Sequence, residues 1–184
     1  MDIRLTPLEG CVVIEPKVFK DERGYFFESF NQKKFSDLTG HDTVFVQDNQ
    51  SYSTKGVLRG LHFQKGRLSQ AKLVQVVKGE VLDVAVDLRS GSKTYGKHFD
   101  IKISAENNLQ LYIPKGFAHG FVVLSDEVIF QYKCDNYYDN AAEGGIHYAD
   151  PELGIDWILP HDQLIVSAKD VELPLLKHVG ELGF

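Results

Sequence analysis

Short runs of β-branched and aromatic residues, each ended by turn residues, recur along almost the whole chain, from 11–16 to 128–134. About ten such runs at this spacing are typical of a β-sandwich or barrel. The clearest helix character is at Asn31–Gly40, which has an asparagine N-cap, Phe35 and Leu38 on one side, and a glycine stop. The pattern predicts an all-β fold: a double-stranded β-helix or jelly roll, a cupin-like barrel with a few short helices.

Several local features add detail to this predicted fold. Lys78 and Gly79 separate two strand-like runs and favour a tight hairpin between them. A second short helix is expected after Asp162, and the segment from Tyr148 onward has weaker strand character and is expected to wrap the outside. No repeat, linker or low-complexity segment divides the chain, so residues 1–184 are expected to form a single domain.

Composition excludes several classes of partner. The formal net charge is −6 and no basic run occurs, so no nucleic-acid partner is expected. No apolar run approaches the roughly 20 residues of a membrane span, and the first residues lack the apolar core of a signal peptide. Cys11 and Cys134 show no CxxC spacing, which indicates free thiols and a reducing compartment. These features predict a cytoplasmic protein with no membrane partner.

The run VLRGLHFQ, residues 57–64, places Arg59, Gly60 and His62 within an otherwise apolar strand. Arginine is rarely buried unless it is paired, and an unpaired charge in a core is costly. Regular alternation would point Arg59 and His62 to opposite faces, but a bulge at Gly60 would turn both into one cavity. Taken alone, the run is explained more simply by a half-exposed edge strand with a solvated arginine and a satisfied histidine.

Other polar residues also interrupt apolar runs. Lys72 begins KLVQVV, Asp83 and Asp87 share one face of VLDVAVDL, His119 opens HGFVVL, and Tyr132 lies in IFQYKC. Each has a simple structural explanation: an exposed strand end, a solvated outer face (above all for Asp87), a capped turn, or a core aromatic with its hydroxyl satisfied. Together with the arginine and histidine above, they describe a barrel lined by polar groups. Cores do not collect that many without a ligand.

The residue types favour acid–base chemistry without a metal or cofactor. Cupin metal sites usually use an H-x-H pair, a glutamate and a later histidine, but Gln64 stands at the second position of LHFQ. The remaining His62 and His119 are too few for a metal site. A histidine base and a tyrosine acid on opposite sides of a substrate can move a proton between the two faces of a carbon. A lysine can stabilise the enolate that forms, and arginine can hold phosphate groups.

These residues lie in blocks that resemble the dTDP-4-dehydrorhamnose 3,5-epimerase family of the L-rhamnose pathway. The resemblance runs nearly end to end and is specific in combination. It rests on the blocks LEGCVVIEPKVFKDERGYFFESF, FVQDNQSYSTKGVLRGLHFQ, KLVQVVKGEVLDVAVDLR, GSKTYG, QLYIPKGFAHGFVVLS, QYKCDNYY, EGGIHYADPELGIDW and SAKD. Two departures, the absence of a proline in YYDNAAEGG and Tyr148 where many relatives carry tryptophan, concern the nucleotide end.

The resemblance implies a role for each matching position. His62 would be the base and Asp170 its orienting carboxylate, Lys72 would stabilise the enolate at the C4 oxygen, and Tyr132 would reprotonate the opposite face. The implied substrate contacts are Arg23, Glu28, Gln47, Asn49, Arg59, His119, Glu143 and Lys169, with Tyr138 stacked on the thymine ring. A homodimer is also implied, in which the N-terminal strands reach the partner's site.

The implied reaction is metal-free epimerisation of dTDP-4-dehydro-6-deoxy-D-glucose at C3 and C5, giving dTDP-4-dehydro-L-rhamnose. Three alternatives stay open on the sequence. A C3-only epimerase would keep the same residues. A metal-dependent cupin oxygenase is disfavoured by Gln64. A non-catalytic sugar-nucleotide-binding protein is disfavoured by the joint presence of His62, Lys72, Tyr132 and Asp170.

Overall fold

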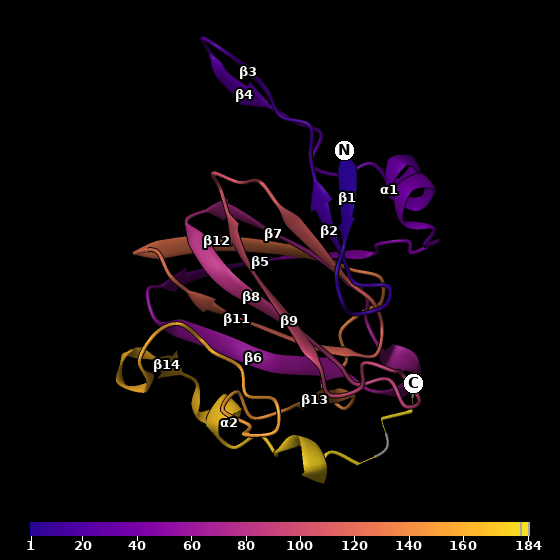
Figure 1. Ribbon diagram of the computed structural model, residues 1–184, viewed down its shortest axis with the longest axis vertical. Helices are drawn as coiled ribbons and strands as arrows, with labels where there is room; N and C mark the ends of the chain where they lie inside the picture. Colours follow the sequence, from indigo (N-terminus) through magenta and orange to yellow (C-terminus); the bar gives the residue numbers. More distant parts are fainter. Residues whose placement is uncertain (181, 184) are drawn as a thin grey trace.

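The computed structural model describes residues 1–180 and 182–183, and two β-sheets packed face to face form its body (Figure 1). The first sheet has the order β1-β2-β10-β7-β12-β5. The second has the order β13-β6-β11-β8-β9, with β14 beside β6. Strands β3 and β4 form a separate hairpin that projects from the body (Figure 1). This architecture confirms the predicted all-β jelly-roll class.

The first sheet consists of Asp2–Leu5 (β1), Val12–Glu15 (β2), Gln110–Ile113 (β10), Lys72–Lys78 (β7), Glu127–Cys134 (β12) and Gln47–Thr54 (β5). The second consists of Glu143–Gly145 (β13), Val57–Gln64 (β6), Phe117–Val123 (β11), Glu80–Asp87 (β8), His98–Ser104 (β9) and Ile165–Val166 (β14). The projecting hairpin joins Phe19–Asp21 (β3) to Gly24–Phe26 (β4). The helices are Gln32–Thr39 (α1) and Ala168–Val171 (α2), with 3-10 turns at Gly66–Leu68, His161–Gln163 and Leu176–His178.

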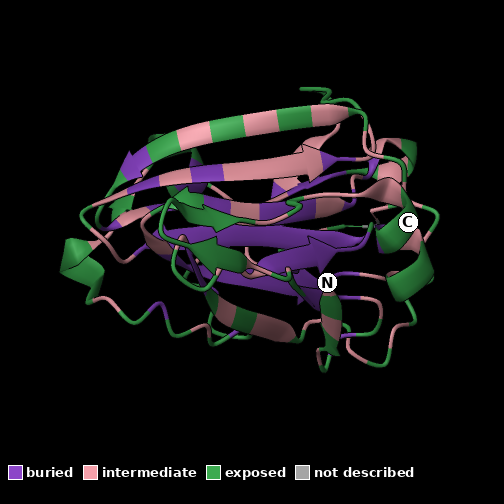
Figure 2. Cartoon of the chain, turned by 90° about the horizontal axis from the view of Figure 1, so that it is seen from above, coloured by how far each residue is buried: buried purple, intermediate pink, exposed green. Residues whose placement is uncertain are grey.

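The main core lies between the two sheets, and strand β8 is buried on both of its faces. Val81 and Ala85 pack into the core between the sheets, whereas Leu82 and Val84 pack into a second cluster on the outer face. The C-terminal segment covers that outer face, as predicted, and Trp157 is part of the cluster. Figure 2 shows the buried strands in the middle of the body with more exposed segments around them.

The predicted hairpin at Lys78-Gly79 is wrong, because β7 and β8 belong to different sheets. Strand β7 pairs with β10 and β12, and strand β8 pairs with β9 and β11. Gly79 has a φ of +83°, and a Cβ there would lie 2.0 Å from the Glu127 carbonyl oxygen. The glycine therefore lets the chain pass tightly from one sheet to the other. The same turn residues would also suit a hairpin, so the local sequence does not distinguish the two.

The predicted helix at Asn31–Gly40 is confirmed. The Asn31 side chain accepts a hydrogen bond from the Lys34 N–H, and Gly40 ends the helix with a φ of 70°. Strand β4 ends at Phe26, where its pairing with β3 ends. The predicted second helix corresponds to α2, which Ser167 caps by accepting a hydrogen bond from the Asp170 N–H.

Cys11 and Cys134 are free thiols, as predicted, and both are buried. Burial raises the pKa of Cys11 to about 12 and that of Cys134 to about 11, so both stay protonated at neutral pH. Among the described residues, no helix combines the length and the apolar character needed to cross a membrane.

Asp87 is fully buried, so the expectation of a solvated outer face is wrong. Its carboxylate accepts hydrogen bonds from Arg89, Ser92 and Thr94. Burial alone would raise the pKa of Asp87, but these donors lower it to about 2. The carboxylate therefore fixes the loop that follows β8.

Replacing Asp87 with asparagine should lower the free energy of unfolding by about 2 kcal/mol at neutral pH. Because the folded-state pKa is depressed, this stabilisation is present above about pH 4 and disappears as the pH falls toward about 2. Urea unfolding across this range measures it, with the exposed Asp126→Asn as control. A difference between wild type and Asp87→Asn that stays constant with pH would contradict the assignment.

Candidate active site

The predicted bulge in β6 is confirmed. His119 of β11 pairs with His62, and Phe121 pairs with Arg59, so β6 has one extra residue between these pairs. Gly60 has a φ of +137°, and a Cβ there would lie 2.5 Å from the Gly120 Cα. Strand β6 lies between β13 and β11, which rules out the edge-strand explanation. Arg59 and His62 consequently line the same cavity.

This cavity, of about 470 Å³, opens between the two sheets. The second sheet contributes His62 and His119, and the first sheet contributes Lys72 and Tyr132. A second cavity of about 300 Å³ shares His62, Lys72 and Tyr132 with the first. The two cavities therefore adjoin at these side chains, and together they are called the groove below.

His62 and Asp170 form a hydrogen-bonded pair, although 108 residues separate them in sequence. The Nε2–Oδ1 distance is 2.7 Å, and the second carboxylate oxygen of Asp170 accepts the Gly60 N–H at 3.2 Å. Burial alone would raise the pKa of Asp170, but the hydrogen bonds from His62 and Gly60 bring it below its usual value. An ionised carboxylate only accepts, so His62 donates from Nε2–H, and Nδ1 is the acceptor of the neutral ring.

Lys72 and Tyr132 lie close together on the facing sheet. The Lys72 Nζ is 5.9 Å from the centroid of the Tyr132 ring. Burial lowers the pKa of Lys72 and raises the pKa of Tyr132. The tyrosine is therefore a protonated phenol at neutral pH, on the wall opposite His62.

The other end of the groove holds a cluster of polar contacts. Glu143 receives hydrogen bonds from the Tyr138 hydroxyl, at 2.8 Å, and from the Lys169 ammonium group. Gln47 donates to the Asn49 side chain at 3.0 Å. Burial would raise the pKa of Glu143, but Lys169 and Tyr138 lower it below its usual value. The negative charge of Glu143 is thus partly neutralised at the groove wall.

Arg23 and Glu28 are the predicted site residues that the structure does not bring to the groove. Arg23 lies on the turn between β3 and β4 and pairs with Asp21. Glu28 pairs with Lys34 of α1 at 2.9 Å. Within one chain, neither side chain lines the groove beside His62.

Some lining residues were missed by the sequence analysis. Phe121 and Phe130 line the cavity with their rings stacked 4.2 Å apart, and Ser51 lines it as well. Asp83 is fully buried behind His119, and its carboxylate lies 2.9 Å from the histidine Nε2. Its place on the apolar face of β8 was visible in the sequence, but its burial was not.

Gln64, at the position where cupin metal sites carry a histidine, is buried, and its side-chain oxygen accepts the Asp139 N–H at 2.9 Å. In residues 1–180 and 182–183, no group of three or more His, Cys, Asp or Glu side chains is arranged to hold a metal ion. The prediction that the site uses no metal is based on Gln64 at this position and on the presence of His62 and His119 alone as histidine ligands in the motif.

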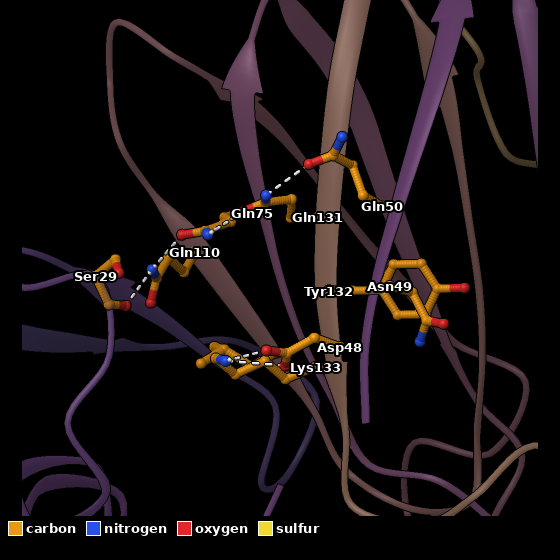
Figure 3. A pocket seen from close by; sticks show the side chains of 10 residues that line it. Ser29, Asp48, Asn49, Gln50, Gln75, Gln110, Gln131, Tyr132 and Lys133 are labelled. Atoms are coloured by element: carbon orange, nitrogen blue, oxygen red, sulfur yellow. Dashed lines mark hydrogen bonds and ion pairs between the residues drawn. The ribbon is translucent and has the colours of Figure 1, made fainter. Parts of the chain in front are cut away.

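A row of glutamines crosses the outer face of the first sheet, beside a third hollow of about 180 Å³ that Asn49 and Tyr132 also line (Figure 3). Gln110 donates to Gln75, Gln75 to Gln131, and Gln131 to Gln50. The side-chain amides of the row therefore serve as hydrogen-bond partners for one another. Lys72 and the histidines lie outside this hollow, so the groove between the sheets remains the candidate site.

A family model described as dTDP-4-dehydrorhamnose 3,5-epimerase matches residues 5–178. The chain belongs to the dTDP-4-dehydrorhamnose 3,5-epimerase family. It is therefore an isomerase, and the resemblance drawn from the sequence blocks is confirmed.

Relatives and solved structures of this family match over almost the whole chain. The dTDP-4-dehydrorhamnose 3,5-epimerase of Salmonella typhimurium is 54% identical over 172 residues, which cover 93% of each chain. The structure of the enzyme of that name from Elizabethkingia anophelis has a TM-score of 0.93 and 55% identity, and the match covers 96% of this chain and 97% of that one. The 3,5-epimerase of Legionella pneumophila, crystallised with dTDP-4-keto-L-rhamnose, has a TM-score of 0.93 and 50% identity, with 97% and 94% covered.

Proposed function

We propose that this family member converts dTDP-4-dehydro-6-deoxy-D-glucose to dTDP-4-dehydro-L-rhamnose by epimerisation at C3 and C5, without a metal or cofactor. The observation that carries the proposal is the placement of His62 and Tyr132 on opposite walls of one cavity, with Lys72 beside the tyrosine. Inversion of a carbon needs a base on one face and an acid on the other.

The first step removes a proton from a carbon next to the C4 ketone. The free Nδ1 of His62 takes the proton, and the C–H electrons move to the C4 oxygen as an enolate. Lys72, which lines the same cavity, is proposed to stabilise that oxygen. Asp170, hydrogen-bonded to the other ring nitrogen, stabilises the imidazolium that forms.

The second step returns a proton to the opposite face of the same carbon. The Tyr132 hydroxyl donates it, the ketone re-forms, and the enzyme exchanges protons with solvent to restore His62 and Tyr132. The C4 ketone acidifies both neighbouring carbons, so the same groups serve C3 and C5 if the sugar reorients between the two steps. The net reaction is an isomerisation that needs no oxidant or reductant.

The nucleotide is proposed to occupy the other end of the groove. Arg59 and Lys169 suit the phosphates, because their side chains lie at the groove and carry positive charge. Tyr138 is exposed beside Glu143, where its ring is available to stack on thymine. Gln47 and Asn49 supply the remaining polar contacts at that end, whereas His119 lines the cavity that is proposed to hold the sugar. The Legionella pneumophila relative, crystallised with dTDP-4-keto-L-rhamnose, supports a dTDP-sugar ligand.

The test is incubation with dTDP-4-dehydro-6-deoxy-D-glucose in deuterated water, followed by proton NMR. We expect deuterium at both C3 and C5, together with formation of dTDP-4-dehydro-L-rhamnose. Exchange and inversion at C3 alone would assign a C3-only epimerase. Binding without exchange at either carbon would indicate a sugar-nucleotide-binding protein, and either result would overturn the proposal.

The proposed active form is a homodimer with N-terminal strand exchange, in which the β3–β4 hairpin reaches the partner's groove. Phe19, Tyr25 and Phe26 of this hairpin are 54%, 58% and 69% exposed, which is unfavourable for aromatic side chains in an isolated chain. Arg23 and Glu28 lie outside their own groove. A partner's groove would give all of these residues a binding role.

Mixed dimers test this exchange. Arg23→Ala should raise KM about 10- to 100-fold, because it removes a charge-assisted contact to the substrate. A dimer formed from one Arg23→Ala chain and one His62→Ala chain contains one site with both residues intact. Co-folding the two defective variants should therefore restore activity. A mixture no more active than its components would show that Arg23 does not act across the dimer.

A further inference from the structure

Asp83 is a buried carboxylate that the reaction described above does not use. It lies on β8 between the two sheets and is fully buried. Its Oδ2 is 2.9 Å from the Nε2 of His119, and its Oδ1 has no hydrogen-bond partner among the described residues. A buried carboxylate with one unsatisfied oxygen is costly. Such a group indicates a constraint other than packing.

The contact determines which hydrogen-bonding role His119 presents to the groove. A carboxylate only accepts, so the histidine nitrogen that faces Asp83 carries the hydrogen. Burial lowers the pKa of His119 and outweighs the opposing effect of Asp83, so the ring is neutral. The second nitrogen, Nδ1, is then an acceptor. Nδ1 has no hydrogen-bond partner among the described residues, but it is not sealed inside the protein. Because His119 lines the cavity, Nδ1 is open to it.

Two histidine–aspartate pairs therefore lie side by side, because His62 and His119 are direct partners across β6 and β11. Their surroundings differ. The His62 side chain is 31% exposed, whereas that of His119 is 7% exposed. Positive charge on Lys72 and His62 further disfavours protonation of His119. The exposed pair suits proton transfer, and the buried pair suits a fixed neutral acceptor.

We propose that Asp83 is a positioning residue for the epimerisation: it holds His119 in the neutral Nε2–H form, so that Nδ1 accepts a hydrogen bond from a hydroxyl group of the sugar. This inference rests on the proposed function. Lys72 only donates and His119 only accepts, so the pair distinguishes the C4 ketone oxygen from a hydroxyl. A sugar bound with its ketone toward His119 would face a repulsive lone pair, and the ketone is thereby directed to Lys72.

Asp83→Asn is the direct test, because the amide can donate to Nε2 and so favours the other tautomer of His119. We expect kcat/KM to fall about 10- to 100-fold, because a buried hydrogen bond is replaced by a mismatch. The affinity for dTDP, which lacks the 4-dehydro-6-deoxy-glucose group, should not change. Asp87→Asn is the matched control: Asp87 is equally buried on the same face of β8, but its carboxylate contacts Arg89, Ser92 and Thr94, which line neither cavity. Its kcat/KM should therefore stay at the wild-type value.

Nitrogen-15 NMR of the histidine rings decides the tautomer without turnover. In the unliganded wild type, His119 should carry its proton on Nε2, and in Asp83→Asn on Nδ1. This measurement also covers the case in which the variant does not fold. A wild-type ring protonated on Nδ1, or on both nitrogens at neutral pH, would overturn the inference even if epimerisation is observed. If the tautomer is as expected but the substrate is not turned over, the proposed function fails instead.

The double variant separates positioning from a general structural role. If Asp83 acts through His119, then adding Asp83→Asn to His119→Gln should cause no further loss of kcat/KM. A structural role predicts that the two losses multiply, and that result would contradict the proposal. Wild-type kcat/KM in Asp83→Asn would contradict it as well.

Discussion

Replacing His62 with alanine should abolish deuterium exchange at both C3 and C5. His62 lines the cavity, and its Nε2 is held by Asp170, so Nδ1 is the acceptor of the neutral ring. A general base contributes roughly 10²- to 10⁴-fold in rate, and the loss of a single base that serves both carbons should lie near the upper end. Proton NMR in deuterated water measures exchange at each carbon separately.

The affinity of His62→Ala for dTDP should stay close to that of wild type, because the nucleotide end of the groove is unchanged. His161→Ala is the matched control, since His161 is an exposed histidine that lines neither cavity. Turnover within a few-fold of wild type in His62→Ala would remove this residue from the mechanism. Loss at one carbon alone would show that the other carbon has a different base.

The second large effect is expected for Tyr132→Phe, which should uncouple exchange from inversion. Burial keeps the Tyr132 pKa above its usual value, so the wild-type residue is a protonated donor at neutral pH. Removing the hydroxyl keeps the ring and leaves His62 on the facing sheet intact. Deprotonation should continue while protonation of the far face slows by roughly 10²- to 10⁴-fold. Deuterium should then enter the substrate faster than the carbons invert.

Both rates can be measured on one sample by NMR. Tyr112→Phe is the control, because the Tyr112 hydroxyl is hydrogen-bonded to Thr43 at 2.8 Å and lies outside the groove. If Tyr132 is only a packing residue, Tyr132→Phe will exchange and invert at wild-type rates. Equal slowing of both rates would instead indicate that the hydroxyl assists deprotonation.

Features governed by neighbouring residues could be predicted from the sequence. The caps of helix α1 follow from Asn31 and Gly40, because side-chain capping and left-handed backbone are local properties. The bulge at Gly60 followed from the parity of two polar residues on one strand, and the register between β6 and β11 confirms it. The likeness of whole blocks to a known family added the function, which no local pattern supplies.

Contacts between distant segments were decided only by the tertiary structure. The pairing of His62 with Asp170 spans 108 residues, and no spacing rule joins residues that far apart. The turn at Gly79 leads into the second sheet because β8 packs against apolar residues on both of its faces there. The identity of the turn residues does not predict that packing. Asp83 and Asp87 share one face in the sequence pattern, but whether that face meets solvent or core depends on which sheet packs against it.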